Sequence, residues 1–81
     1  MPNPGERRIV LYVRDGCHLC EDAAVLMNEM IGPDGYATID IDSDDDLLVR
    51  YSHRIPVLSV DGEDRLELIF TKPDLQQALD R

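Results

Sequence analysis

Hydrophobic and polar residues follow two different periods in the first part of the chain. The segment Arg8–Val13 is rich in β-branched residues and almost continuously apolar, which is typical of a central strand covered on both faces. From His18 onward, apolar residues recur at helical spacing and polar residues occupy the opposite face. The apolar face of this predicted helix consists of Leu19, Ala23, Leu26, Met27 and Met30. Residues 32–35, Gly-Pro-Asp-Gly, end the helix and turn the chain.

The middle of the chain is predicted to form a second strand and a short helix. Tyr36–Asp42 alternates between apolar and polar residues. Because a helix separates this segment from the first strand, the two strands form a βαβ unit and run parallel. Ser43 is the predicted N-cap of the short helix, and the acidic residues after it suit the positive end of the helix dipole. The buried side of this helix is expected at Leu47, Leu48 and Tyr51.

The last third of the chain is predicted to form a hairpin and a final helix. Val57–Val60 reads as a strand, Asp61-Gly62 as a tight turn and Arg65–Phe70 as the returning strand of an antiparallel pair. Thr71 is expected to cap the last helix, because a proline and an aspartate follow it in the first turn. The inward side of that helix is expected at Leu75, Ala78 and Leu79.

Length and composition indicate a single domain. Of the 81 residues, residues 1–7 are rich in proline and glycine and are expected to be a flexible lead-in, which leaves 8–81 as one domain with one modest core. No apolar run approaches the roughly 20 residues that a membrane-spanning helix needs. No apolar signal segment is visible at the start, so the expected location is the cytoplasm, where thiols are kept reduced.

The net charge of the chain limits the classes of molecule that it is expected to bind. A net charge of −9 argues against nucleic acids and anionic membranes, because both select basic surfaces. The aspartate-rich segment that starts at Asp40 suggests a calcium loop at first sight. Counted from Asp40, however, Asp45 stands where such a loop needs its turn glycine and Tyr51 where it needs a bidentate glutamate. The aspartate-rich segment therefore fits the pattern of a calcium-binding loop poorly.

The chemistry of the chain is concentrated in its two cysteines. Cys17 and Cys20 are separated by two residues and lie where the first strand feeds the first helix. A helix N-terminus directs free N–H groups and a positive dipole end toward Cys17, which favours the reactive thiolate. Cys20, one turn further on, is then the resolving thiol that attacks a mixed disulfide on Cys17. This pattern indicates thiol–disulfide exchange.

Two other interpretations of the cysteine pair are weaker. A zinc site needs about four ligands, and the chain offers only His18 and His53 beside the two cysteines, with no second Cys-x-x-Cys. A purely structural disulfide that closes so short a loop would remove little entropy from the unfolded chain. Redox chemistry explains the pair better than a contribution to stability does.

Three motifs together resemble a known family. They are the Cys17–Cys20 pair after the first strand, the acidic strand end at 39–42 followed by 47–51, and the segment Ile55-Pro56-Val57-Leu58 before the hairpin. From Ile9 to the last helix, the chain resembles glutaredoxin-like domains of the thioredoxin superfamily. The resemblance implies an α/β thioredoxin-like fold, with a four-stranded mixed sheet in the order 2-1-3-4 and helices on both faces. It also implies a cis Ile55–Pro56 bond beside Cys17, which leaves the Ile55 backbone free to pair with a substrate.

The same resemblance implies roles for individual residues. Cys17 becomes the nucleophile and Cys20 the resolving thiol, while Arg14 stands where glutaredoxins commonly carry a basic residue that contacts glutathione. The chain departs from the family pattern at His18-Leu19, where Pro-Tyr is usual. It also departs at residues 69–72, Ile-Phe-Thr-Lys, where a Gly-Gly pair normally receives a glutathione carboxylate.

Two further expectations concern basic side chains near the cysteines. His18, as a cation beside Cys17, would favour the thiolate. Arg14 and Arg54 are expected to form one basic rim that holds anionic substrates. Arg14 precedes Cys17 by three residues and Arg54 precedes Pro56 by two, and the resemblance implies that the Pro56 loop lies beside Cys17.

The expected function is that of a small cytosolic thiol–disulfide oxidoreductase. Its expected partners are disulfide-containing or glutathionylated proteins, or glutathione itself as co-substrate, with no bound cofactor or metal and with the chain acting as a monomer. The electron donor is left open between glutathione and a flavoenzyme reductase. The alternative is a redox-inert adaptor that binds a partner segment at the Pro56 loop.

Overall fold

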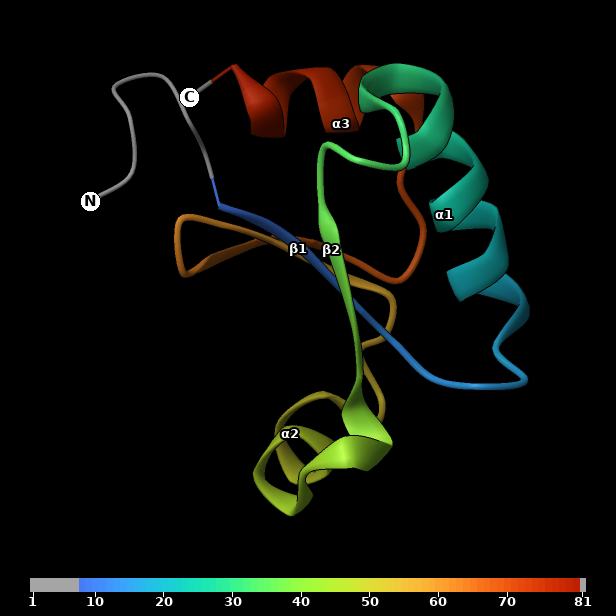
Figure 1. The fold of residues 1–81 in the computed structure, drawn as a ribbon, viewed down its shortest axis with the longest axis vertical. Helices are drawn as coiled ribbons and strands as arrows, with labels where there is room; N and C mark the ends of the chain where they lie inside the picture. The colour runs from blue at the N-terminus through green and yellow to red at the C-terminus, as the bar shows by residue number, and fades with distance from the viewer. Residues whose placement is uncertain (1–7, 81) are drawn as a thin grey trace.

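The computed structural model of the chain describes residues 8–80 (Figure 1). The lead-in predicted at 1–7 lies outside the described residues. The elements follow the order β1 (Ile9–Val13), α1 (His18–Ile31), β2 (Ala37–Asp40), the 3₁₀ turn η1 (Ile41–Ser43), α2 (Asp45–Tyr51), β3 (Val57–Val60), β4 (Glu63–Glu67) and α3 (Lys72–Leu79). None of the α-helices in this part of the chain has the length and apolar character needed to cross a membrane.

The strands form one mixed sheet in the order β2-β1-β3-β4. β1 pairs with β2 in parallel, while β3 runs antiparallel to both β1 and β4. β1 and β3 therefore occupy the centre, and all four residues of β3 are buried. β2 and β4 form the two edges of the sheet. The predicted fold class and strand order are confirmed.

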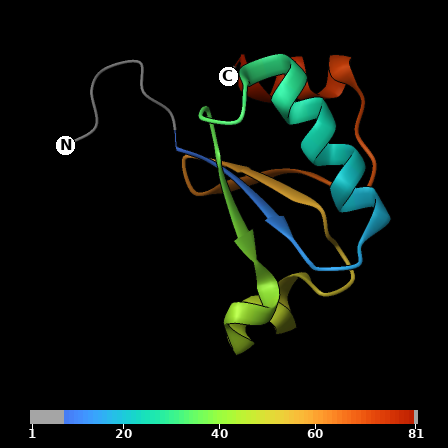
Figure 2. The ribbon, with the colours of Figure 1, turned by 45° about the vertical axis from the view of Figure 1, so that its right-hand side comes forward.

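Helices cover both faces of this sheet. Figures 1 and 2 show α1 and α3 beside each other, with α2 set apart from them. The main core lies between the sheet and these two helices; its buried members are Leu11, Ala23, Met27, Leu58, Val60, Leu75 and Ala78. A smaller core under α2 contains Ile41, Tyr51 and Val57, with Tyr12, Leu47, Leu48 and Ile55 packed against it. Neighbouring residues of β1, Leu11 and Tyr12, belong to opposite clusters because successive side chains of a strand point to opposite faces.

The second strand is shorter than predicted. It ends at Asp40 rather than Asp42 because the Asp40 carboxylate accepts the backbone N–H of Asp42 at 2.9 Å and starts the η1 turn. The Ser43 hydroxyl donates to the backbone carbonyl of Asp40 at 2.6 Å and closes that turn. This local bonding competes with continued strand pairing.

The N-cap of α2 also differs from the prediction. Asp44 holds this position instead of Ser43, and its carboxylate accepts the N–H of Asp46 at 2.8 Å. A shift of one residue is enough because aspartate and serine are both good N-caps. The hydrophobic side predicted for α2 is confirmed, with Tyr51 buried and Leu47 and Leu48 packed beside it.

The returning strand of the hairpin starts and ends earlier than predicted. Asp61 and Gly62 both have positive φ, 54° and 84°, so the turn takes two residues and pairing resumes at Glu63. The strand ends at Glu67 because Leu68 has φ 65°, which is incompatible with an extended strand. Residues 68–70 consequently form a loop that leads to α3.

Candidate active site

Cys17 lies at the junction between β1 and α1. Its backbone is extended, with φ −94° and ψ 109°, and it is the N-cap of α1. The chain reaches it through a tight turn in which the Cys17 N–H donates to the Arg14 carbonyl at 3.3 Å. Gly16 supplies the φ of 76° that this turn uses. The sequence thus places the first cysteine where the free N–H groups of a helix start are directed.

Cys17 and Cys20 are joined as a disulfide. The backbone N–H of Cys20 donates to the Cys17 sulfur at 3.1 Å, so this sulfur already has a donor that would also stabilise a thiolate. Cys17 is half-buried, whereas Cys20 is only 4% exposed. An incoming group can therefore reach the first sulfur more easily than the second.

A groove of about 340 Å³ opens beside the disulfide, between the first turns of α1 and the end of β2. It is lined by Val13, Arg14, Asp15, Gly16, Cys17, Cys20, Glu21, Ala24, Thr38 and Asp40. Its charged members are three carboxylates and one guanidinium. Both cysteines belong to the lining, so a molecule that enters the groove meets the disulfide.

Arg14 and His18 lie close to Cys17 but are directed differently. Arg14 lines the groove and its Nε donates to the Asp42 carboxylate at 3.1 Å. The side chain of His18 is 85% exposed, and its two ring nitrogens lie 3.8 Å from the carboxylates of Glu21 and Asp22. The role of His18 in favouring the thiolate stays a prediction.

Arg54 does not share the groove with Arg14. Its Nε donates to Glu67 at 2.6 Å, its Nη2 lies 3.5 Å from Asp64, and its guanidinium carbon lies 5.3 Å from the centre of the Tyr51 ring. The hydrogen bond to Glu67 raises the pKa of Arg54 above its ordinary value, and the nearby Asp64 adds to this effect. Arg14 and Arg54 thus line different hollows and have different acidic partners. Their joint role in holding an anionic substrate stays a prediction.

The Pro56 loop is bound to the loop before α3. The Ile55–Pro56 peptide bond is cis. Pro56 is buried. The Leu68 N–H donates to the Pro56 carbonyl at 2.9 Å and also to the Arg54 carbonyl at 3.2 Å. Ile55 is partly buried and packs against the smaller core, and the pairing of its backbone with a substrate stays a prediction.

Sequence reasoning missed the apolar loop at residues 68–70. A small hollow of about 70 Å³ is lined there by Leu19, Asp22, Ala23, Leu68, Ile69 and Phe70. Leu68 is 45% and Ile69 74% exposed. The apolar run was assigned to the returning strand, and the positive φ of Leu68 is a feature that no sequence pattern signals at a leucine.

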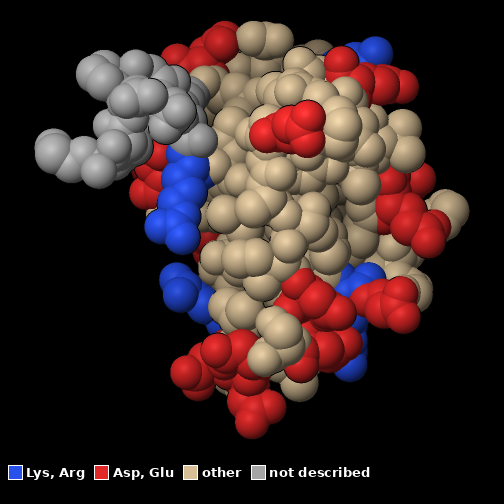
Figure 3. Space-filling model, in the orientation of Figure 1, with Lys and Arg blue, Asp and Glu red and all other residues tan. Residues whose placement is uncertain are grey.

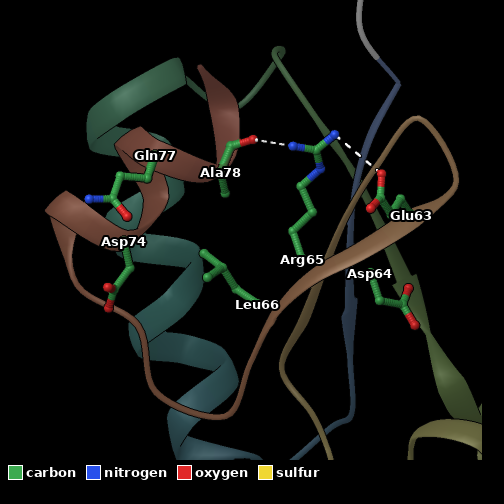
Figure 4. Close-up of a pocket in the computed structure, with 7 residues that line it drawn as sticks. All are labelled: Glu63, Asp64, Arg65, Leu66, Asp74, Gln77 and Ala78. Atoms are coloured by element: carbon green, nitrogen blue, oxygen red, sulfur yellow. Dashed lines mark hydrogen bonds and ion pairs between the residues drawn. The ribbon is translucent and has the colours of Figure 1, made fainter. Parts of the chain in front are cut away.

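Another hollow lies between β4 and α3, and neither cysteine belongs to its lining (Figure 4). It has a volume of about 290 Å³. Figure 4 shows Arg65 extending from β4 toward the end of α3, where its Nη1 donates to the Ala78 carbonyl at 3.2 Å. Its Nη2 lies 3.5 Å from Glu63. Arg65 therefore ties the edge strand to a carbonyl near the helix C-terminus, which indicates a structural role.

Comparison with known proteins agrees with this architecture. A profile of the glutaredoxin-like domain family (DUF836) matches residues 8–80. The crystal structure of the protein XcR50 from X. campestris is 36% identical over 89% of this chain and 95% of its own, with a TM-score of 0.75. The solution structure of Ne2328 from Nitrosomonas europaea is 27% identical over 96% of this chain and 98% of its own, with a TM-score of 0.68.

More distant structures share the fold. A thioredoxin variant from Halobacterium salinarum is 21% identical over 93% of this chain and 73% of its own, with a TM-score of 0.66. No protein with a curated description matches the chain. From the match over residues 8–80 and the relationship to XcR50, we conclude that the chain belongs to the family of glutaredoxin-like domains, with a thioredoxin-like fold and a Cys17–Cys20 pair close enough to form a disulfide.

Proposed function

We propose that the protein is a thiol–disulfide oxidoreductase that uses Cys17 and Cys20 as a dithiol. The observation that carries the proposal is the unequal placement of the two sulfurs at the start of α1. Cys17 is half-buried and its sulfur accepts the Cys20 N–H, whereas Cys20 is buried. Membership of the glutaredoxin-like family supports the same chemistry.

The proposed reaction moves two electrons from the dithiol to a client disulfide. The Cys17 thiolate attacks one client sulfur, which forms a mixed disulfide and releases the other client sulfur as a thiolate that takes up a proton. The Cys20 thiol loses its proton and attacks the Cys17 sulfur, which releases the second client thiolate and leaves the Cys17–Cys20 disulfide. The cytosolic pool of glutathione or a flavoenzyme reductase then returns two electrons to the pair. No bound cofactor is required.

The positions of the sulfurs support this order of attack. The more exposed sulfur can reach a client, and the helix N-terminus stabilises its negative charge. The buried sulfur lies one helical turn away and is already within bonding distance of Cys17. A disulfide-containing or glutathionylated protein is the proposed client in the cytoplasm.

The redox equilibrium with glutathione tests the proposal. The protein is equilibrated with mixtures of reduced and oxidised glutathione, the thiols are trapped by alkylation, and the reduced fraction is counted by mass spectrometry. We expect a midpoint between about −180 and −270 mV, the range of catalytic dithiols. A Cys20→Ser variant should accumulate a mixed disulfide on Cys17. A midpoint below about −300 mV, typical of structural disulfides, or a pair that never exchanges would contradict the proposal and favour a redox-inert adaptor.

A further inference from the structure

The groove beside the disulfide is acidic. Asp15 comes from the loop before α1, Glu21 from the first turn of α1 and Asp40 from the end of β2, so three separate elements contribute an acidic residue to the lining. The fourth charged member, Arg14, is held at 3.1 Å by Asp42. Its positive charge is therefore balanced by a residue outside the lining. Asp40 accepts the Asp42 N–H at 2.9 Å and Glu21 lies 3.8 Å from His18, but the lining that the structure describes contains no second basic residue to balance the three acidic ones. At this part of the surface, where the loop between β1 and α1 lies in Figure 1, Figure 3 shows acidic side chains around the basic ones.

The groove lies on the β2 side of the disulfide. Its lining comes from β1, α1, β2 and the loop before α1, and it contains none of the residues of β3 and β4. The Pro56 loop lies on the other side, because the sheet order places β3 across β1 from β2. A client bound across Cys17 would thus contact two different surfaces of the protein, one on each side of the client disulfide. The surface toward β2 is the acidic one.

We propose that this groove receives a basic side chain next to the client disulfide, so that the dithiol reacts faster with disulfides flanked by lysine or arginine than with anionic ones such as glutathione disulfide. The inference rests on the proposed function and names its substrate class. Cys17 and Cys20 themselves line the groove, which is the independent reason to expect a client segment there.

The physical basis is local rather than global. Clefts lined by charges of one sign raise the local concentration of the opposite charge. At physiological salt the Debye length is about 8 Å, so the net charge of the whole chain contributes little at the sulfur while Asp15, Glu21 and Asp40 contribute directly. The same carboxylates repel an anionic client.

Three synthetic peptides test the inference. Each has blocked termini and one cysteine in a mixed disulfide with 2-mercaptoethanol, flanked by lysine, glutamate or glutamine. The reduced protein is mixed with each peptide, and oxidation of the dithiol is followed by rapid alkylation and mass spectrometry. The two thiols of the protein lose two electrons and two protons, and the mixed disulfide takes them up to release the peptide thiol and 2-mercaptoethanol. We expect the lysine peptide to react about tenfold faster than the glutamate peptide at low salt, with a smaller ratio at about 0.3 M salt.

Two variants locate the effect. Glu21→Lys places a positive charge in the groove and should reduce the lysine-to-glutamate rate ratio below about threefold or invert it. Asp34→Lys makes the same change in net charge on an exposed turn beyond the far end of α1, which lies about 15 Å from Glu21 along the helix axis, and should keep the wild-type ratio. The rate with the glutamine peptide corrects each variant for a change in thiol reactivity.

The outcomes separate the two proposals. Oxidation by all three peptides at equal rates, or faster oxidation by the glutamate peptide, overturns the acidic-groove inference and leaves the dithiol function intact. The same holds if Glu21→Lys keeps the wild-type ratio, or if Asp34→Lys loses as much of it as Glu21→Lys does. If none of the peptides oxidises the dithiol, the proposed function fails and the inference built on it fails as well.

Discussion

At the scale of single residues, the two cysteines differ in how far a reagent can reach them. Cys17 is the N-cap of α1 and half-buried, and its sulfur accepts the N–H of Cys20. Cys20 is part of the buried side of the helix. Once the disulfide is reduced, the same N–H can stabilise a thiolate on Cys17, whereas Cys20 is only 4% exposed.

We therefore expect Cys17 to be modified first. Reduced protein treated near neutral pH with less than one equivalent of iodoacetamide should carry most of the label on Cys17, because alkylation follows both exposure and thiolate character. Peptide mapping by mass spectrometry gives the distribution, and denatured protein serves as the control in which the two thiols should react alike. A label found mainly on Cys20 would show that the assignment of nucleophile and resolving thiol is reversed.

Tyr51 is a residue whose environment alters its ionisation. It is buried in the smaller core, its hydroxyl donates to Asp64 at 3.1 Å, and its ring stacks on Tyr12 with 4.5 Å between centres. Burial raises the pKa of Tyr51, the hydrogen bond to Asp64 and the charge of Asp64 raise it further, and Arg50 lowers it.

This raised pKa predicts a loss of stability at alkaline pH. The folded state holds the Tyr51 proton more tightly than the unfolded state, where the pKa is about 10, so the contribution is fully present below pH 10 and is lost as the pH rises above it. With the disulfide intact, the free energy of unfolding in urea should fall between pH 8 and a pH above 10. Tyr51→Phe should lose less over this interval, although its stability at pH 8 is lower by about 0.5–1.5 kcal/mol for the lost hydrogen bond.

Tyr36 is the comparison for this experiment. Burial raises the pKa of Tyr36 as well, so Tyr36→Phe should also remove part of the alkaline loss. If Tyr51→Phe loses as much stability between the two pH values as the wild type does, Tyr51 does not contribute to the alkaline transition.

At the scale of elements, α3 depends on its first turn. The helix spans eight residues, Lys72–Leu79, and isolated helices of this length are marginal in water. Thr71 and Asp74 cap it reciprocally: the Asp74 N–H donates to the Thr71 hydroxyl at 3.4 Å, and the Thr71 N–H donates to the Asp74 carboxylate at 3.0 Å. Leu75 and Ala78 then bury the inner side of the helix in the main core.

Removal of the cap should destabilise the protein measurably. Thr71→Ala loses the side-chain acceptor and should lower the free energy of unfolding by about 1 kcal/mol, whereas Thr71→Ser keeps a hydroxyl and should stay close to the wild type. Urea unfolding followed by circular dichroism measures both variants. Equal losses in the alanine and serine variants would point to the missing methyl group instead of the cap.

At the scale of the whole molecule, local patterns predicted the elements well and the side-chain partners poorly. The strand Val57–Val60 and the cap at Thr71 were predicted correctly because they depend on neighbouring residues. The acidic partners of Arg14 and Arg54 were not predicted, because they depend on the fold. Asp42 lies 28 positions from Arg14 and Glu67 lies 13 from Arg54.

The candidate site shows the same division. The spacing of the cysteines and the helix after them were enough to place Cys17 at the helix start. The acidic groove was not predicted, because it needs the end of β2 beside α1, and only tertiary structure places Asp40 near Glu21 in one lining. The loop at 68–70 was missed because a left-handed backbone at a leucine has no sequence signature.

The order of the sheet has a consequence for aggregation. β2 and β4 are its edges, and an exposed edge can recruit a strand from another molecule. β2 has only four residues and leads into an acidic turn, while β4 begins and ends with the exposed carboxylates of Glu63 and Glu67. Short length and charge on edge strands oppose the addition of another strand. Both edges thus work against amyloid-type stacking of like chains, whether the Cys17–Cys20 bond is open or closed.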